Sequence, residues 1–206
     1  MFSQQITKEE INQLPLQRYE GKMVVIADPE KQAEALAEVS QHAVVGFDTE
    51  TKPAFKKGVR HEVALLQLAV PDKVFLIRLH HTGFSLEMAR FFADEAIIKV
   101  GISIRDDIKH LERLASKQSV AFQPENILEL NDVAKSLKIE HAGVKKLTAI
   151  FLGFRVSKGQ QTSNWENPQL TEAQQRYAAT DAWVCLEIYQ RLLDLGYLEK
   201  GGRGEG

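Results

Sequence analysis

The sequence predicts an α/β fold in which a mixed five-stranded sheet is flanked by helices on both faces. Short apolar runs, typical of buried strands, occupy much of the first half of the chain. Two of these runs are separated only by Pro71-Asp72-Lys73, which indicates an antiparallel hairpin. Further along, apolar runs alternate with amphipathic segments, and this alternation is typical of strands joined by helices that cover both faces of a sheet.

The chain begins with an expected N-terminal extension over residues 1–22. Within it, Thr7 and Glu10 have the spacing of a capping box and predict a short helix. A short strand is expected over residues 23–26, and Asp28 then has the features of a residue that caps a helix.

The domain proper is expected over residues 23–198, and the Gly-rich residues 199–206 are expected to form a flexible tail. The five strands of the sheet are predicted over residues 43–49, 62–70, 74–77, 96–100 and 127–130. Helices are predicted over residues 86–92 and 105–117, and the remaining C-terminal part is predicted to be helical with breaks at Gly153, 157–168 and Gly196.

The composition indicates one packed domain in a reducing compartment. Of the 206 residues, 44% are hydrophobic, which is enough for a sizeable core. A net charge of −2 excludes a strongly basic nucleic-acid coat, but it allows a nuclease whose acids balance basic loops. The polar N-terminus, the lack of a long apolar run and the single Cys185 predict a cytoplasmic protein without a membrane segment. No protein partner is indicated.

Two carboxylates end the most central of the predicted strands. Asp48 and Glu50 follow the apolar run 44–47, and alternation along a strand places both side chains on the same face. Two like charges at the end of a buried strand are costly unless a cation offsets them, and Mg²⁺ prefers carboxylate oxygens. The other Asp-x-Glu of the chain, at residues 28–30, is explained by a helix start instead.

A third acid is selected by helical periodicity. Asp107 shares a helix face with Leu111 and Leu114, whereas Asp106 aligns with polar residues. Asp107 is therefore the acid expected to point inward, and Asp106 remains an alternative. Because the predicted strand 96–100 is expected beside the central strand, both pairs of acids fall at the carboxyl ends of neighbouring strands, where ligands bind in open α/β sheets.

A fourth acid lies on the last long helix. Asp181 falls within an apolar stripe, four residues after Tyr177 and four before Cys185. An unpaired buried carboxylate costs several kcal/mol. Either a buried basic partner or a metal ion is therefore expected beside Asp181. For Tyr177, a core position with its hydroxyl at the rim is the alternative to a catalytic one.

These residues resemble the three motifs of the DnaQ-like 3′–5′ exonucleases. The matching segments are Phe47-Asp48-Thr49-Glu50, residues 101–107 and Tyr177-Ala178-Ala179-Thr180-Asp181, of which the last is typical of the tyrosine (DEDDy) branch. Residues 63–68 and 163–165 are similar to the Werner-type exonuclease domain and to ribonuclease D. The resemblance covers about residues 24–195 and implies a ribonuclease-H-like sheet.

The resemblance also implies a mechanism. Asp48, Glu50, Asp107 and Asp181 would hold two divalent cations, Mg²⁺ or Mn²⁺, and Tyr177 would orient the attacking water. The expected activity is a metal-dependent 3′–5′ exonuclease that releases nucleoside 5′-monophosphates from single-stranded 3′ ends, with DNA favoured. A ribonuclease D-like RNA 3′-end processing enzyme and a catalytically silent nucleic-acid-binding module are the alternatives. A domain whose acids are merely ion-paired is a further one.

Substrate contacts are expected from basic and aromatic residues near the motifs. The first basic set, which directly follows the first acids, consists of Lys52, Lys56, Lys57 and Arg60. The second basic set, nearer the third motif, consists of Lys145, Lys146, Arg155 and Lys158. A solvated loop is an equal alternative for the first set. Phe55 and Trp165 are expected either to stack on a base or to belong to the core.

Overall fold

A computed structural model describes residues 4–54, 56, 58–140 and 142–199. It shows a sheet in the order β1-β4-β3-β2-β5-β6, so that the sheet has six strands rather than the five predicted. The additional strand is β1, which comes from the predicted run 23–26 and pairs with β4 in parallel. The predicted number of strands was wrong because the residues of this run do not show that it pairs with a strand that is distant in the sequence.

The strands are otherwise close to their predicted positions. Their bounds are β1 Lys22–Ile26, β2 Val44–Thr51, β3 Val63–Val70, β4 Lys73–Ile77, β5 Ile98–Gly101 and β6 Ile127–Glu129. The predicted hairpin is confirmed, since β3 and β4 pair antiparallel with Val70 opposite Lys73. The central strand β2 pairs antiparallel with β3 and parallel with β5, which makes the sheet mixed as predicted.

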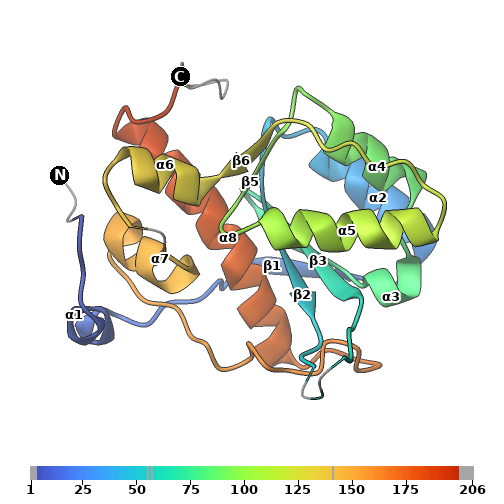
Figure 1. Ribbon diagram of the computed structural model, residues 1–206, viewed down its shortest axis with the longest axis horizontal. Coiled ribbons are helices and arrows are strands. Elements are labelled where there is room, and N and C mark those ends of the chain that lie inside the picture. Colours follow the sequence, from blue (N-terminus) through green and yellow to red (C-terminus); the bar gives the residue numbers. More distant parts are fainter. Residues whose placement is uncertain (1–3, 55, 57, 141, 200–206) are drawn as a thin grey trace.

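Helices cover both faces of the sheet (Figure 1). Their bounds are α1 Lys8–Gln13, α2 Pro29–Val39, α3 Leu79–Thr82, α4 Leu86–Ala93, α5 Arg105–Lys117, α6 Leu130–Ser136, α7 Val144–Leu152 and α8 Glu172–Asp194. The expected caps are confirmed, because Thr7 and Glu10 form a capping box on α1 and Asp28 accepts from the first turn of α2. No described helix has the length and apolar character required to cross a membrane.

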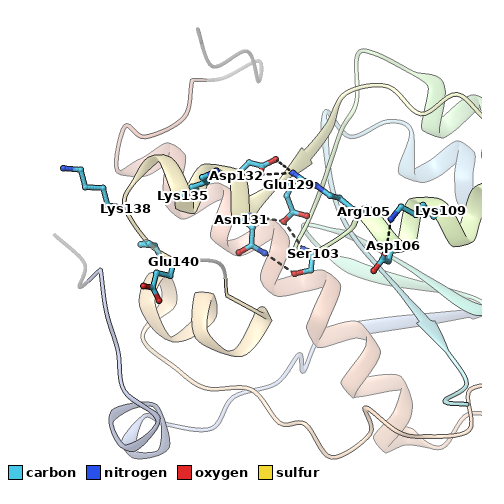
Figure 2. Close-up of a pocket in the computed structure, with 11 residues that line it drawn as sticks. Ser103, Arg105, Asp106, Lys109, Glu129, Asn131, Asp132, Lys135, Lys138 and Glu140 are labelled. Atoms are coloured by element: carbon cyan, nitrogen blue, oxygen red, sulfur yellow. Dashed lines mark hydrogen bonds and ion pairs between the residues drawn. The ribbon is translucent and has the colours of Figure 1, made fainter. Parts of the chain in front are cut away.

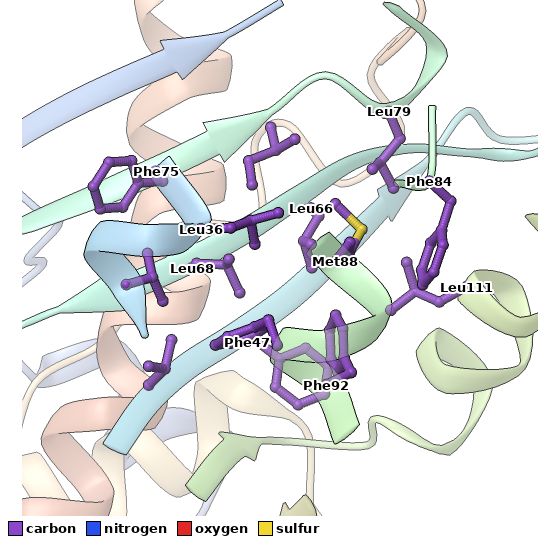
Figure 3. Packing of buried hydrophobic residues seen from close by; sticks show 14 of the residues in the cluster. Leu36, Phe47, Leu66, Leu68, Phe75, Leu79, Phe84, Met88, Phe92 and Leu111 are labelled. Carbon is purple, nitrogen blue, oxygen red and sulfur yellow. The ribbon is translucent and has the colours of Figure 1, made fainter. Parts of the chain in front are cut away.

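One face of the sheet packs against α2, α4 and α5. Phe47 of β2 and Leu66 of β3 are fully buried there, together with Leu36, Met88 and Phe92 from the covering helices (Figure 3). The Phe47 and Phe92 rings meet edge to face, with centroids 5.7 Å apart. This core fixes the odd-numbered side chains of β2 on one face and thereby directs Gly46, Asp48 and Glu50 to the other.

The opposite face packs against α8, which crosses the sheet closely at Gly46. A Cβ atom built on Gly46 would lie 2.3 Å from the Ala182 carbonyl oxygen, so only glycine permits this approach. Ala178, Ala179 and Ala182 present small side chains on the same helix and are buried against β3 and β4. The close crossing brings the middle of α8 to the carboxyl end of β2.

Candidate active site

Three of the four predicted acids meet at the carboxyl end of β2. Asp48 and Glu50 come from the strand and Asp181 comes from α8, and each offers a carboxylate oxygen within 4.8 Å of the other two. They lie in a pocket of about 730 Å³, which Tyr177 also lines. The strand supplies two acids on one face because its side chains alternate, and the close crossing of α8 supplies the third.

These acids are crowded, and the described residues offer them no basic partner. None of Asp48, Glu50 and Asp181 forms an ion pair with another described residue. Burial raises the pKa of Glu50 to about 9 and that of Asp181 to about 7. Burial, together with the neighbouring acids, also raises the pKa of Asp48 well above its usual range. Carboxylates that ionise with such difficulty are stabilised in the charged form by a cation.

The donor set fits hard divalent cations. All the donors are carboxylate oxygens, which suit Mg²⁺ and Mn²⁺, whereas no cysteine or histidine belongs to the group. Because no ion pair offsets the charges in the described part of the chain, the hypothesis of merely ion-paired acids loses its support. The residues present therefore fit the metals that the sequence led us to expect.

Asp107 lies beside this group but outside the set of three. It is half-buried at the start of α5, and its carboxylate accepts a hydrogen bond from the Thr49 hydroxyl. Burial raises the pKa of Asp107 to about 6, and its charge contributes to raising the pKa of Glu50. Asp106, in contrast, is exposed and pairs with Lys109 at 2.9 Å. The structure thus turns Asp107 inward and Asp106 outward, as the periodicity indicates.

A strained turn places the first turn of α5. Ser103 has a φ of 63°, a conformation that non-glycine residues rarely adopt. The Glu129 carboxylate accepts hydrogen bonds from the backbone N–H groups of Ser103 and Ile104, both at 2.9 Å. Asn131 also donates to the Ser103 hydroxyl, and Figure 2 shows Glu129 and Asn131 beside Ser103. Sequence reasoning missed Glu129 in this role, although an acid at the end of a predicted strand was the available indication.

Tyr177 lies one helical turn before Asp181 and is half-buried in the pocket. Burial raises the pKa of its phenol, and the nearby acids raise it further, so the hydroxyl stays protonated at neutral pH. The Trp165 ring lies 6.0 Å from the Tyr177 ring. Trp165 is completely buried, so it supports Tyr177 from the core and the expectation that it stacks on a base is wrong for this structure.

Gln67 is a second residue that sequence reasoning missed. It lies directly opposite Asp48 in the β2–β3 register and therefore shares the face of the sheet that carries the acids. The side chain is fully buried, and neither its amide nitrogen nor its amide oxygen has a hydrogen-bond partner among the described residues. A lone polar residue within the apolar run 63–70 was the indication in the sequence.

The described members of the first basic set, Lys52, Lys56 and Arg60, do not line the acid pocket. Lys52 forms an ion pair with Glu166 at 3.0 Å. Lys52 and Lys56 both line a smaller, separate pocket. Arg60 lines another pocket, near His80 and His81. Lys57 and Phe55 lie outside the described residues.

The second basic set lies closer to the acids than the first. Lys145 and Lys146 on α7 and Lys158 in the following loop line the same pocket as Asp48, Glu50 and Asp181. Arg155 has a different role, because its side chain donates to the Leu14 carbonyl at 3.0 Å. The pocket therefore combines an acidic side with a basic side.

Comparison with known proteins gives consistent results. Residues 23–196 match the family model described as 3′–5′ exonuclease. The mouse bifunctional 3′–5′ exonuclease/ATP-dependent helicase WRN is 36% identical over 165 residues, which cover 77% of this chain and 11% of the mouse protein. The human exonuclease mut-7 homolog is 33% identical over 176 residues, which cover 73% of this chain and 20% of the human protein. The chain thus corresponds to a small part of these relatives.

Solved structures show the same fold. The Aedes aegypti Nibbler EXO domain superposes with a TM-score of 0.74 at 23% identity, over 87% of this chain and 94% of that domain. Escherichia coli RNase D, whose structure is described as that of an exoribonuclease, gives a TM-score of 0.72 at 19% identity, over 87% of this chain and 47% of that one. Both likenesses concern the arrangement of sheet and helices.

Proposed function

Because the chain belongs to the 3′–5′ exonuclease family, we propose that it hydrolyses the terminal phosphodiester bond of a single-stranded 3′ end. The products are nucleoside 5′-monophosphates and a strand shortened by one nucleotide. The observation that supports this proposal best is the group of three unpaired carboxylates, drawn from β2 and α8, in a pocket that also contains lysines. Asp48, Glu50 and Asp181, with Asp107 beside them, would hold two divalent cations.

Each residue of the site has a distinct task. The bound cations would supply a nucleophilic water at neutral pH and stabilise the leaving 3′-oxygen. The protonated Tyr177 hydroxyl holds the attacking water in line, since its raised pKa makes it a poor base. The Thr49 hydroxyl donates a hydrogen bond to the Asp107 carboxylate. The Glu129 carboxylate accepts a hydrogen bond from the Ile104 N–H and so fixes the start of α5, the helix that carries Asp107. Lys145, Lys146 and Lys158 offer positive charge to the phosphates.

DNA is the proposed substrate, and RNA 3′-end processing is the alternative. The fold is shared with ribonucleases D, one of which has been solved with RNA U12, whereas the mouse relative combines its exonuclease with a helicase. Contacts to the ribose 2′-OH distinguish the two substrates. A catalytically silent binding module is disfavoured, because all four acids and Tyr177 are present and the three acids of the cluster converge.

The test is a cleavage assay on matched oligomers. Single-stranded DNA and RNA of one sequence, labelled at either end, are incubated with the protein and Mg²⁺, Mn²⁺ or EDTA. We expect a ladder that shortens from the 3′ end, mononucleotide products and no cleavage in EDTA. The Asp181→Asn variant serves as the inactive control, which excludes a contaminating nuclease. Cleavage that persists in EDTA, or that begins at the 5′ end, would contradict the proposal.

A further inference from the structure

We infer that Lys8, on the short helix α1, binds a backbone phosphate of the substrate strand upstream of the scissile bond. This inference rests on the proposed function and extends the site beyond the segment that the family model matches. Residues 23–196 match the family model, and Lys8 lies before them. The extension thus contributes a wall of the substrate channel from outside the segment that the family model matches.

The wall is formed by residues that no catalytic motif contains. Ile6, Lys8, Ile11 and Asn12 line the same pocket as the three acids. In the view of Figure 1, α7 lies between α1 and α8. Lys145 and Lys146, at the start of α7, line the pocket together with Lys8 and Asp181. A strand whose 3′ end meets the acids would therefore run past lysines of both helices.

The lysines of this pocket are available for a polyanion. Lys8, Lys145, Lys146 and Lys158 line it, and none of the four forms an ion pair with another described residue. Several lysines elsewhere have acidic partners instead, as Lys31 has with Glu34 at 2.8 Å. Unpaired positive charges from three separate segments of the chain, facing one cavity, match the repeated phosphates of a single strand.

The wall is fixed to the domain rather than loosely attached. The backbone of residues 15–17 pairs with Arg155, whose side chain also donates to the Leu14 carbonyl at 3.0 Å. Gln4 donates to the Leu137 carbonyl at 3.1 Å, and the Ile11 side chain is buried. Further along, the Tyr19 N–H donates to the Thr180 hydroxyl of α8. The short helix that carries Lys8 is therefore held in place before any substrate binds.

Binding is tested without cleavage. Fluorescence anisotropy of a labelled 12-nucleotide single strand in EDTA is measured against NaCl concentration for the full chain and for Lys8→Gln. A phosphate contact to a single strand contributes about 0.7 to the slope of log K against log salt, so Lys8→Gln should lower the slope by about 0.7 and weaken binding about fivefold at 0.1 M salt. Lys22→Gln is the matched control, because Lys22 is also exposed and unpaired in the described structure but does not line the acid pocket.

Cleavage kinetics give a second readout. With Mg²⁺ present, Lys8→Gln should raise KM on long oligomers more than it lowers kcat, and this rise should shrink as the oligomer is shortened. Thermal melts confirm that the variants are folded. The inference is overturned if Lys8→Gln keeps the full salt slope while Lys145→Gln loses part of it, a result that leaves the proposed function intact. A full chain that neither binds nor cleaves any single strand would overturn both.

Discussion

Asp106 and Asp107 are neighbours in the sequence, but α5 gives them opposite surroundings. Asp106 is exposed and pairs with Lys109, so its charge is solvated. Asp107 faces Thr49 and contributes to the electrostatics of Glu50. Helical periodicity alone was sufficient to separate the two, because residues that share a face with Leu111 must point inward.

The two acids should therefore differ strongly on substitution. We expect Asp107→Ala to lower kcat by more than about 100-fold, equivalent to roughly 3 kcal/mol of transition-state stabilisation. Asp106→Ala removes only a surface pair and should stay within about threefold of the wild type. Single-turnover cleavage with saturating Mn²⁺ measures both. The reverse order of activities would show that Asp107 is not part of the site.

Gln67 is a buried polar residue next to the acids, and its burial costs free energy of folding. Both polar atoms of its buried amide lack hydrogen-bond partners in the described part of the chain, so Gln67→Met should raise the free energy of unfolding by about 1–3 kcal/mol. Gln32→Met is the comparison variant. The buried Gln32 amide nitrogen donates to Thr82 and Gly83, although the amide oxygen has no partner among the described residues, so the loss of these two hydrogen bonds should destabilise the protein. Urea unfolding compares the two variants. Destabilisation by Gln67→Met would show that the amide is satisfied.

Lys99 should make stability depend on pH. Its side chain is buried, donates to the Asp94 carbonyl at 2.7 Å and has its pKa lowered by burial to about 8. The unfolded chain holds this proton up to about pH 10.5, so the folded state binds fewer protons between these values and its stability rises with pH there. Compared with Lys99→Met, the wild type should gain stability between pH 7 and 10. A difference that stays constant with pH would contradict this.

At the scale of elements, the site depends on how closely α8 crosses β2. Gly46 permits the crossing, and the alanines of α8 present a flat surface to the sheet. The three carboxylates therefore converge only because two elements that are distant in the sequence approach without a side chain between them. The register of β2 against β3 also brings Gln67 next to Asp48.

A single methyl group should disturb this arrangement. In Gly46→Ala the new Cβ would lie 2.3 Å from the Ala182 carbonyl oxygen, so α8 must shift away from the sheet. We expect a loss of about 1–3 kcal/mol of stability, together with weaker metal binding, because Asp181 moves away from Asp48 and Glu50. Urea unfolding and calorimetric Mn²⁺ titration measure the two effects. If the variant is destabilised but binds Mn²⁺ with unchanged affinity, the close packing of α8 at Gly46 does not control the position of Asp181.

At the scale of the whole molecule, much of the fold was predictable from local patterns. Apolar runs predicted the strands, capping residues predicted where helices begin, and helical periodicity selected Asp107. Pairing between distant segments was not predictable, because the residues of a run such as 23–26 do not indicate which strand it pairs with, in this case β4. For the same reason the sequence did not show that α1 lines the acid pocket or that Trp165 lies beneath Tyr177.

Metal binding should stabilise the whole fold. The acids have no basic partner among the described residues, so a cation that binds only the folded state adds about 2.7 kcal/mol at 100 times its Kd. For a domain of this size that corresponds to a rise in Tm of about 5–10 °C. Melts with Mn²⁺ and with EDTA measure the rise, and Asp181→Asn should show a smaller one. Equal melting temperatures with and without metal would contradict a metal site.

The order of the chain has a consequence for how the protein is made. The acids of β2 appear early in synthesis, whereas Asp181 belongs to α8, the last helix described. Domains generally fold as units as they leave the ribosome, and the three-carboxylate cluster is incomplete until α8 has docked. A growing chain that lacks α8 therefore has no complete three-carboxylate cluster while it is still attached to the ribosome. Completion of the fold and acquisition of the cluster become a single event.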